Sequence, residues 1–255
     1  MTPAGGEVLL RGTQITRRWG GLVAVDGVSL ALQRGAVHAV IGTNGAGKST
    51  FINVLSGEIA ATAGRVTLLG HDVTHWTQPR RARAGLGRSY QRTTIFPRFT
   101  VLENCRLAAQ ARHPHALALW ARAERCPQSL ALARDAMAKA GLTAHAARAA
   151  GSLSHGQKRQ LEIAMCLATS PQVLLLDEPL AGMGAEETER MLELLAALKP
   201  GHAILLVEHD MDAVFALADR LTVMVDGAVL ESGPPEAIRA SKAVQQAYLG
   251  EPLHE

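Results

Sequence analysis

The chain has 255 residues, 47% hydrophobic and 19% charged, which excludes intrinsic disorder and allows one large domain or one domain with an insertion. The net charge of +3 is small, and three widely spaced cysteines argue against a disulfide framework or a metal site and fit a reducing cytoplasm. No apolar stretch approaches membrane-spanning length and the N-terminus has no signal-peptide core, so we expect any work at a membrane to need a partner.

Residues 7–35 are predicted to form short strands separated by glycine turns. The strand-like segments are 8–10, 14–17 and 28–31, with breaks at 20–21, 26–27 and 34–35. Trp19 lies beside the first break, where it is either a core aromatic or a ring on which a nucleotide base stacks. The two glycines after Trp19 would leave such a ring uncovered.

The stretch 37–50 is predicted to be a strand, a glycine-rich turn and a helix that ends near Ser56. Its central part matches the phosphate-binding pattern G-x-x-x-x-G-K-[ST], in which backbone N–H groups and the helix N-terminus face one anion. In that pattern the lysine reaches the terminal phosphates and the serine hydroxyl holds Mg²⁺. The alternative is a glycine turn without a ligand. The expected nucleotide-binding residues are Gly42, Asn44, Gly45, Ala46, Gly47, Lys48, Ser49 and Thr50.

Eight arginines lie between positions 79 and 112, after a predicted strand at 65–69. A nucleic-acid-binding patch would have aromatic residues interleaved with the basic ones, and this stretch lacks that pattern. We therefore expect a solvated or partner-binding surface. Within the stretch, Gln91 precedes an irregular loop at 93–97.

The composition of an alanine- and leucine-rich stretch from 101 to about 150 favours helices, with breaks near 113–114, 126–127 and 141. We interpret it as part of a helical subdomain, about 93–160, inserted into an α/β core. Ser154 then is a natural N-cap for a helix that runs to about Ala168. The start of that helix is either a plain cap or a second anion site of the same kind as the first.

The continuous apolar run 173–176 predicts a central parallel strand, and it ends in Asp177 and Glu178. Carboxylates at the C-terminal end of such a strand lie where α/β sheets place ligands. One can bind Mg²⁺ through water, and its neighbour can activate a water. A helix at 185–198 and a buried strand at 204–207 follow. His209 then either joins the carboxylates at the same sheet edge or only decorates a helix N-terminus.

The C-terminal part is predicted to contain a hairpin at 222–231 with a type I′ turn at Asp226 and Gly227. A last helix is expected from Pro234 to near Leu249.

In this order, the motifs resemble those of the ATPase subunits of ABC transporters along almost the whole chain. The resemblance implies an α/β fold: a P-loop NTPase (RecA-like) core with an N-terminal antiparallel β subdomain and an inserted α-helical subdomain. The ATP-binding domain would span 7–250, and the hairpin end, helix and tail would occupy 231–255. The matching residues are Gly42–Ser49 for Walker A, Asp177 for Walker B, Glu178 for the catalytic glutamate, Gln91 for the Q-loop, His209 for the switch histidine, Trp19 for the base-stacking aromatic and 153–157 for the signature.

Further segments are similar to the LivG-type subfamily, which serves uptake of branched-chain amino acids and of urea, amides and small acids. These segments are 18–25, 96–104, 161–165, 181–183 and 247–251. Two departures stand out. The signature has His155 and Gly156 where a glycine pair is usual, a form familiar in this subfamily. Gly184 replaces an acidic or amide residue of the D-loop, so communication between two sites would be altered.

The resemblance implies that ATP and Mg²⁺ lie between the P-loop of one subunit and the signature of another. Ser154, Gly156 and Gln157 would then face the γ-phosphate bound by the other subunit. Glu178 would polarise the attacking water, with His209 positioning it. The Mg²⁺ would be organised by Ser49, Gln91 and Asp177.

The implied partners are a second ATPase subunit, identical or a sibling, and two permeases. A groove lined by the loop 93–98 and the helix from Val101 would receive a short permease helix. An external, periplasmic binding protein would be an indirect partner. This subunit would lie at the cytoplasmic face of the bacterial inner membrane. Nucleic acid is not expected as a partner.

Two other functional classes of ABC protein share part of this pattern. The tail also resembles the ATPase of lipopolysaccharide extraction, but the segments at 20–24 and 181–183 favour the importer. A soluble, nucleic-acid-related ABC factor would usually carry two cassettes, and only one is present.

Overall fold

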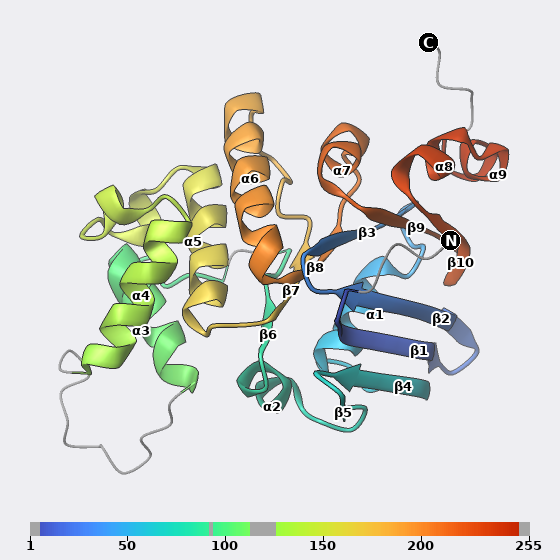
Figure 1. Ribbon diagram of the computed structural model, residues 1–255, viewed down its shortest axis with the longest axis horizontal. Helices are drawn as coiled ribbons and strands as arrows, with labels where there is room; N and C mark the ends of the chain where they lie inside the picture. The colour runs from blue at the N-terminus through green and yellow to red at the C-terminus, as the bar shows by residue number, and fades with distance from the viewer. Residues whose placement is uncertain (1–5, 92–93, 113–125, 250–255) are drawn as a thin grey trace.

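The computed structural model describes residues 6–91, 94–112 and 126–249, arranged as two β-sheets and a group of helices (Figure 1). The first sheet is antiparallel, in the order β2-β1-β4-β5. Its strands are β1 (Val8–Trp19), β2 (Leu22–Gln33), β4 (Ala63–Leu68) and β5 (His71–Asp72). This sheet forms the N-terminal β subdomain that the sequence predicted.

The short strands predicted for residues 7–35 are in fact two long ones. Within β1 and β2, irregular register near Gly12 and Ile15 accommodates Gln14, whose φ is 51°, and Gly27, whose φ is 61°. Such bulges let a strand pass through residues that would otherwise end it. The predicted breaks at 20–21 and 34–35 are turns, whereas 26–27 lies within β2.

The second sheet is the core of the fold, in the order β10-β9-β3-β8-β7-β6, and only β10 runs antiparallel to its neighbour. Every residue of β7 and β8 is buried, because helices or the other sheet cover both faces of these parallel strands. Their C-terminal ends meet at one edge, where Asp177 pairs in register with Val207. The strands are β3 (Ala36–Gly42), β6 (Leu86–Arg88), β7 (Val173–Asp177), β8 (Ala203–Val207), β9 (Arg220–Val225) and β10 (Ala228–Gly233).

The helix α1 (Lys48–Ser56) packs in the core that the two sheets share, through Phe51 and Leu55 among others. It ends at Gly57, as predicted, with φ of 81°. Its last carbonyls are bound by Arg81 of α2 (Gln78–Arg83), which donates to Val54 O at 2.9 Å and Leu55 O at 2.7 Å. Arg81 is only 1% exposed, so the expectation of a solvated arginine stretch is wrong at this residue.

The helical subdomain lies to one side of the parallel sheet and comprises α3 (Val101–Arg112), α4 (Pro127–Lys139) and α5 (His155–Ala168) (Figure 1). Two short 3₁₀ turns, Thr143–His145 and Ala150–Ser152, join α4 to α5. The subdomain shares one hydrophobic cluster with the sheet, in which Met137 of α4 belongs with Leu174 and Leu206. It is therefore packed onto the core.

The remaining helices are α6 (Ala185–Leu198), a 3₁₀ turn (Lys199–Gly201), and α7 (Met211–Leu217). Asp226 and Gly227 have φ of 48° and 81°, as the predicted type I′ turn between β9 and β10 requires. The single C-terminal helix that was predicted is broken at Ser241, whose backbone is extended and whose hydroxyl accepts from Val244 N. The pieces are α8 (Pro235–Ala240), α9 (Lys242–Val244) and a π-helical turn (Gln245–Leu249).

Two expectations fall on residues that the structure does not describe: Thr93 of the loop at 93–98, and positions 250–255 of the C-terminal tail. In the three described ranges, no helix combines the length and apolar character needed to cross a membrane.

Candidate nucleotide site

The loop between β3 and α1 is shaped by its backbone. Gly45 and Gly47 have φ of 84° and 94°, a conformation that residues with a side chain rarely adopt. At Gly47 an added Cβ would also lie 2.2 Å from Ala24 O. Main-chain hydrogen bonds close the loop, from Ala46 N to Thr43 O at 3.1 Å and from Gly227 N to Ala46 O at 3.2 Å. The chain alone therefore gives the loop its curvature.

Lys48 lies at the start of α1 and is only 8% exposed. Its Nζ donates to Gly42 O at 2.6 Å and to Thr43 O at 3.0 Å, so the ammonium is held over the loop. Burial lowers the pKa of Lys48, although the carboxylates of Glu178 and Asp177 counteract that shift. The other predicted phosphate ligands surround it: Ala46 is buried, Thr50 is half-buried, and Asn44 and Ser49 are exposed.

Asp177 ends β7 and is 4% exposed. Its Oδ2 lies 4.0 Å from Arg88 Nη2, while its buried Oδ1 has no hydrogen-bond partner among the described residues. Burial raises the pKa of this carboxyl, and the Arg88 charge opposes the rise. A buried, unpartnered carboxylate oxygen is unusual, and it is the type of ligand that Mg²⁺ prefers. The residues present therefore fit the predicted magnesium site.

Glu178 lies between the other two residues predicted to be catalytic. Its Oε2 accepts a 2.9 Å hydrogen bond from Gln91 Nε2, and its Oε1 lies 3.5 Å from His209 Nδ1. The backbone of Glu178 has φ of 50°, in the left-handed region, and its N–H donates to Val207 O at 2.9 Å. Strained backbone of this kind is concentrated at functional sites. Here it turns the side chain of Glu178 toward Gln91 and His209.

Two buried charged side chains, Arg159 and Glu208, hold this arrangement, and sequence reasoning missed both. Arg159 of α5 donates to Tyr90 O at 3.0 Å and to Gln91 O at 2.7 Å, and it pairs with Glu162. Glu208, which is 1% exposed, accepts from Leu180 N at 2.8 Å and from His209 N at 3.2 Å. The only sequence signal for Glu208 is a charged residue directly after a buried strand, next to His209.

The signature begins with Ser154, the N-cap of α5. Its Oγ accepts from Gln157 N at 3.2 Å and its N–H donates to Gln157 Oε1 at 3.1 Å, a capping box. The hydroxyl of Ser154 also donates to Glu187 Oε1 of α6 at 2.8 Å. A Cβ added at Gly156 would lie 2.5 Å from Glu187 Cδ, so a larger residue there would displace the end of the Glu187 side chain. Sequence reasoning gave no role to Glu187.

The signature departure His155 contacts the segment that leads to the D-loop departure Gly184. His155 Nε2 is 3.0 Å from Ala181 O, and a Cβ at Gly182 would meet the same ring nitrogen at 3.2 Å. Gly184 is the N-cap of α6 and makes no side-chain cap. His155 thus contacts the loop that follows Glu178 in the same chain.

The structure brings some predicted site residues together and keeps others apart. No hydrogen bond or ion pair among the described residues joins the signature to the phosphate loop. Trp19 ends β1 and is 41% exposed, with the Arg17 guanidinium 4.7 Å from its ring centroid. The ring is therefore not a core aromatic. That Trp19 stacks on a nucleotide base remains a prediction.

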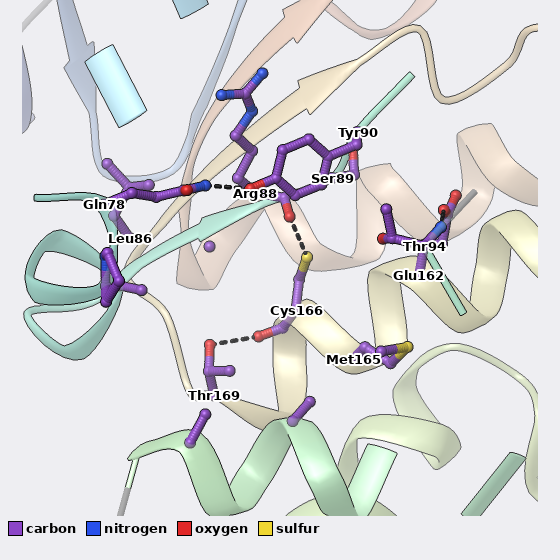
Figure 2. A pocket seen from close by; sticks show the side chains of 15 residues that line it. Gln78, Leu86, Arg88, Ser89, Tyr90, Thr94, Glu162, Met165, Cys166 and Thr169 are labelled. Carbon is purple, nitrogen blue, oxygen red and sulfur yellow. Dashed lines mark hydrogen bonds between the residues drawn. The ribbon is translucent and has the colours of Figure 1, made fainter. Parts of the chain in front are cut away.

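A cavity of about 320 Å³ lies between the sheet edge and the helical subdomain (Figure 2). Its wall is mostly apolar and comes from α2, β6, α3 and α5. Within the stretch expected to line a permease groove, Thr94, Ala108 and Ala111 border this cavity, whereas Val101 is buried in the core. Other lining residues are Leu86, Tyr90, Met165 and Cys166.

Two family models match this chain. One, described as ABC transporter, covers residues 25–181, the span that holds the phosphate loop, the signature and the two carboxylates. The chain belongs to the ABC transporter family. The other, described as branched-chain amino acid ATP-binding cassette transporter, matches residues 228–254 of this ABC subunit.

Relatives and solved structures agree over nearly the whole length. The cassette is 39% identical to the high-affinity branched-chain amino acid transport ATP-binding protein BraF of Pseudomonas aeruginosa, over 95% of this chain and 98% of the relative. It is 40% identical to the corresponding protein LivG of Escherichia coli K12, over 96% and 99%. A solved ATP-binding cassette of an ABC transporter in its ADP conformation matches with a TM-score of 0.86 and 30% identity, over 96% and 100%.

Proposed function

We propose that this ABC cassette hydrolyses ATP and couples hydrolysis to the import of branched-chain amino acids or a related small solute such as urea, an amide or a small acid. The observation that carries the proposal is the carboxylate of Glu178, held between Gln91 and His209 at the sheet edge beside Lys48. The relatives named for branched-chain amino acid transport favour the importer over lipopolysaccharide extraction.

The phosphates of ATP would bind in the loop that starts at Gly42. Backbone N–H groups there and the N-terminus of α1 favour an anion. The ammonium of Lys48 would exchange its carbonyl contacts for phosphate oxygens, and exposed Ser49 lies at the same helix start. Mg²⁺ would be held by Ser49, Gln91 and Asp177, and it supplies charge neutralisation on the phosphates when bound.

Glu178 would accept a hydrogen bond from the attacking water and orient it. His209 is 57% exposed at its side chain, so it is free to reach a phosphate oxygen when a ligand arrives. Phosphoryl transfer depends mainly on positioning and charge neutralisation, and Gln91, Glu178 and His209 provide positioning from three different loops. The main chain of Gln91 is tied to α5 by Arg159, so a movement of the helical subdomain would move Gln91.

A second cassette, identical or a sibling, would complete each site. The signature of one subunit has a helix N-terminus with Ser154 and Gly156, which can receive an anion, and among the described residues no hydrogen bond or ion pair joins it to the phosphate loop of its own chain. We infer that it serves the ATP held by the other subunit. Trp19 would stack on the base of the ATP held by its own subunit.

The cavity in Figure 2 is the groove that would receive a short helix from a permease. Its apolar wall suits such a helix, and Thr94, three positions after Gln91 in the sequence, lines one border. Two permeases would hold the cassettes at the cytoplasmic face of the bacterial inner membrane, and a periplasmic binding protein would deliver solute. We expect no nucleic-acid partner.

The test is co-expression with the neighbouring permease and binding-protein genes, followed by reconstitution into vesicles. We expect leucine, isoleucine or valine, or one of the related solutes, to raise ATP hydrolysis and to be taken up. The variant Glu178→Gln should support neither. Hydrolysis by this variant at the parent rate would refute the proposed role of Glu178. Salt-dependent binding of RNA by the purified cassette would instead support the nucleic-acid-related class.

A further inference from the structure

Arg88 is the last residue of β6, three positions before Gln91, and its side chain is 6% exposed. A guanidinium this deeply buried needs partners on several sides, because desolvating a charge is costly. Three of its partners lie at the end of the P-loop helix α1. Nη1 donates to Ser56 Oγ at 2.5 Å and to Glu58 Oε2 at 2.6 Å, and Nη2 donates to Asn53 Oδ1.

The other side of the same guanidinium faces Asp177. Nη2, the nitrogen that binds Asn53, lies 4.0 Å from Asp177 Oδ2. The two oxygens of Asp177 are therefore in different surroundings. Oδ2 faces a fixed cation, and the buried Oδ1 has no protein partner in the part of the chain that the structure describes. Arg88 thus pairs electrostatically with the carboxylate, without a hydrogen bond at this distance, while its own hydrogen bonds hold it to the end of the helix that starts at Lys48.

We propose that Arg88 is a positioning residue for the metal site: it holds the Asp177 carboxylate against the end of α1 so that Oδ1 is presented to the Mg²⁺ that accompanies ATP. The inference rests on the proposed function, in which Asp177 is a metal ligand. The planar fork of an arginine suits this role, because one rigid group can address Asn53, Glu58 and Asp177 at once. Residues that orient a metal ligand in this way are worth 10–100-fold in metal affinity.

Arg88 also borders the groove. Its guanidinium carbon lies 4.7 Å from the ring centroid of Tyr90, and the Tyr90 hydroxyl accepts from Gln78 Nε2. All three side chains line the cavity in Figure 2. The positioning residue of the metal site is thus in contact with the wall that a permease helix would touch.

The experiment measures metal binding apart from turnover. Mn²⁺ is titrated into the full chain holding one equivalent of ATP, and free Mn²⁺ is read from its electron paramagnetic resonance signal. ATP affinity without metal is measured separately with a fluorescent analogue. In Arg88→Met we expect Mn²⁺ affinity to fall by about tenfold or more while metal-free ATP affinity stays within about twofold of the parent. Arg88→Lys, which keeps the charge and loses the fork, should fall in between.

Arg81→Met is the matched control, because Arg81 is also buried and also binds the end of α1, but it donates to backbone carbonyls and forms no ion pair with Asp177 among the described residues. It should leave Mn²⁺ affinity unchanged. If Arg88→Met folds and binds Mn²⁺ as tightly as the parent or more tightly, the inference is overturned. If Arg88→Met does not fold, parent-like Mn²⁺ binding by Arg88→Lys overturns the inference.

Asp177→Asn separates this inference from the proposed function. If Asp177→Asn weakens Mn²⁺ binding and the Arg88 variants do not, only the role of Arg88 fails. If Asp177→Asn also binds Mn²⁺ like the parent, the assignment of Asp177 as a metal ligand fails, and the inference about Arg88 fails with it.

Discussion

The phosphate loop and the signature are the two proposed anion sites, each at a helix N-terminus, yet they are built differently. Main-chain hydrogen bonds and glycines in the left-handed region shape the loop, and its functional cation Lys48 is buried within it. At the signature, side chains set the geometry: Ser154 is bound by Gln157 and by Glu187. The phosphate loop has its proposed binding groups in one chain. The Ser154 hydroxyl would have to leave the Glu187 carboxylate to bind a phosphate held by another subunit.

The largest effect is expected from Glu178→Gln. The substitution keeps the size of the side chain but removes the charge that orients the water, so ATP hydrolysis should fall by about 10³-fold. Binding by the phosphate loop should persist, and an ATP-bound dimer should accumulate, measured by light scattering. Phosphate release at the parent rate would show that another residue orients the water.

Lys48→Ala tests the phosphate loop alone. Removing an ammonium that is already buried at the loop should lower ATP affinity by about 100-fold, measured by fluorescence titration. Lys199→Ala is the control, since Lys199 pairs with Asp219 away from the loop. Undiminished ATP affinity in Lys48→Ala would refute the nucleotide site.

Ser154→Ala tests the signature. We expect hydrolysis to fall by about tenfold, because one phosphate hydrogen bond is lost, whereas ATP affinity of the isolated subunit should not change. Ser152→Ala, which removes a hydroxyl bound to Ala149 O, should affect neither. A loss of ATP affinity in the monomer would mean that the signature serves its own chain, which would remove the contrast drawn above.

The last prediction concerns the stability of the strand that carries the loop, where ATP binding and hydrolysis are not measured. His38 of β3 is buried beside Thr222, and burial lowers its pKa from 6.5 to about 4. Below pH 6.5 the unfolded chain therefore binds a proton at His38, whereas the folded chain does not until the pH is near 4. The free energy of unfolding thus falls as the pH decreases from 6.5 to 4. The contribution is about 3 kcal/mol. Urea denaturation of the parent and of His38→Gln at both pH values should differ by this amount, and equal losses would contradict it.

The helices and buried strands could be predicted because their signals are local. The cap at Ser154, the glycine after α1 and the unbroken apolar run of β7 each lie within a few residues of the element they define. Chemistry at Glu178 could be anticipated because carboxylates after a parallel strand lie at the ligand edge of the sheet.

The failures come from contacts between distant positions. The register of the long β1–β2 hairpin depends on bulges that a strand pattern does not reveal. Arg81 is buried because the end of α1, more than twenty residues earlier, needs donors. The role of Glu187 depends on α6 passing beside the start of α5. No spacing in the sequence predicts such a contact between distant positions, so the roles of Arg81 and Glu187 could be recognised only in the fold.

The meeting of Gly156 and Glu187 also decides how variants of the signature should be interpreted. A side chain at position 156 would displace the Glu187 carboxylate, which binds the Ser154 hydroxyl, inside the same subunit. An inactive Gly156 variant therefore combines this displacement with any loss of phosphate binding. Substituting Glu187 by alanine in the same chain would give the new side chain room, so that the two contributions can be separated by a double-mutant cycle.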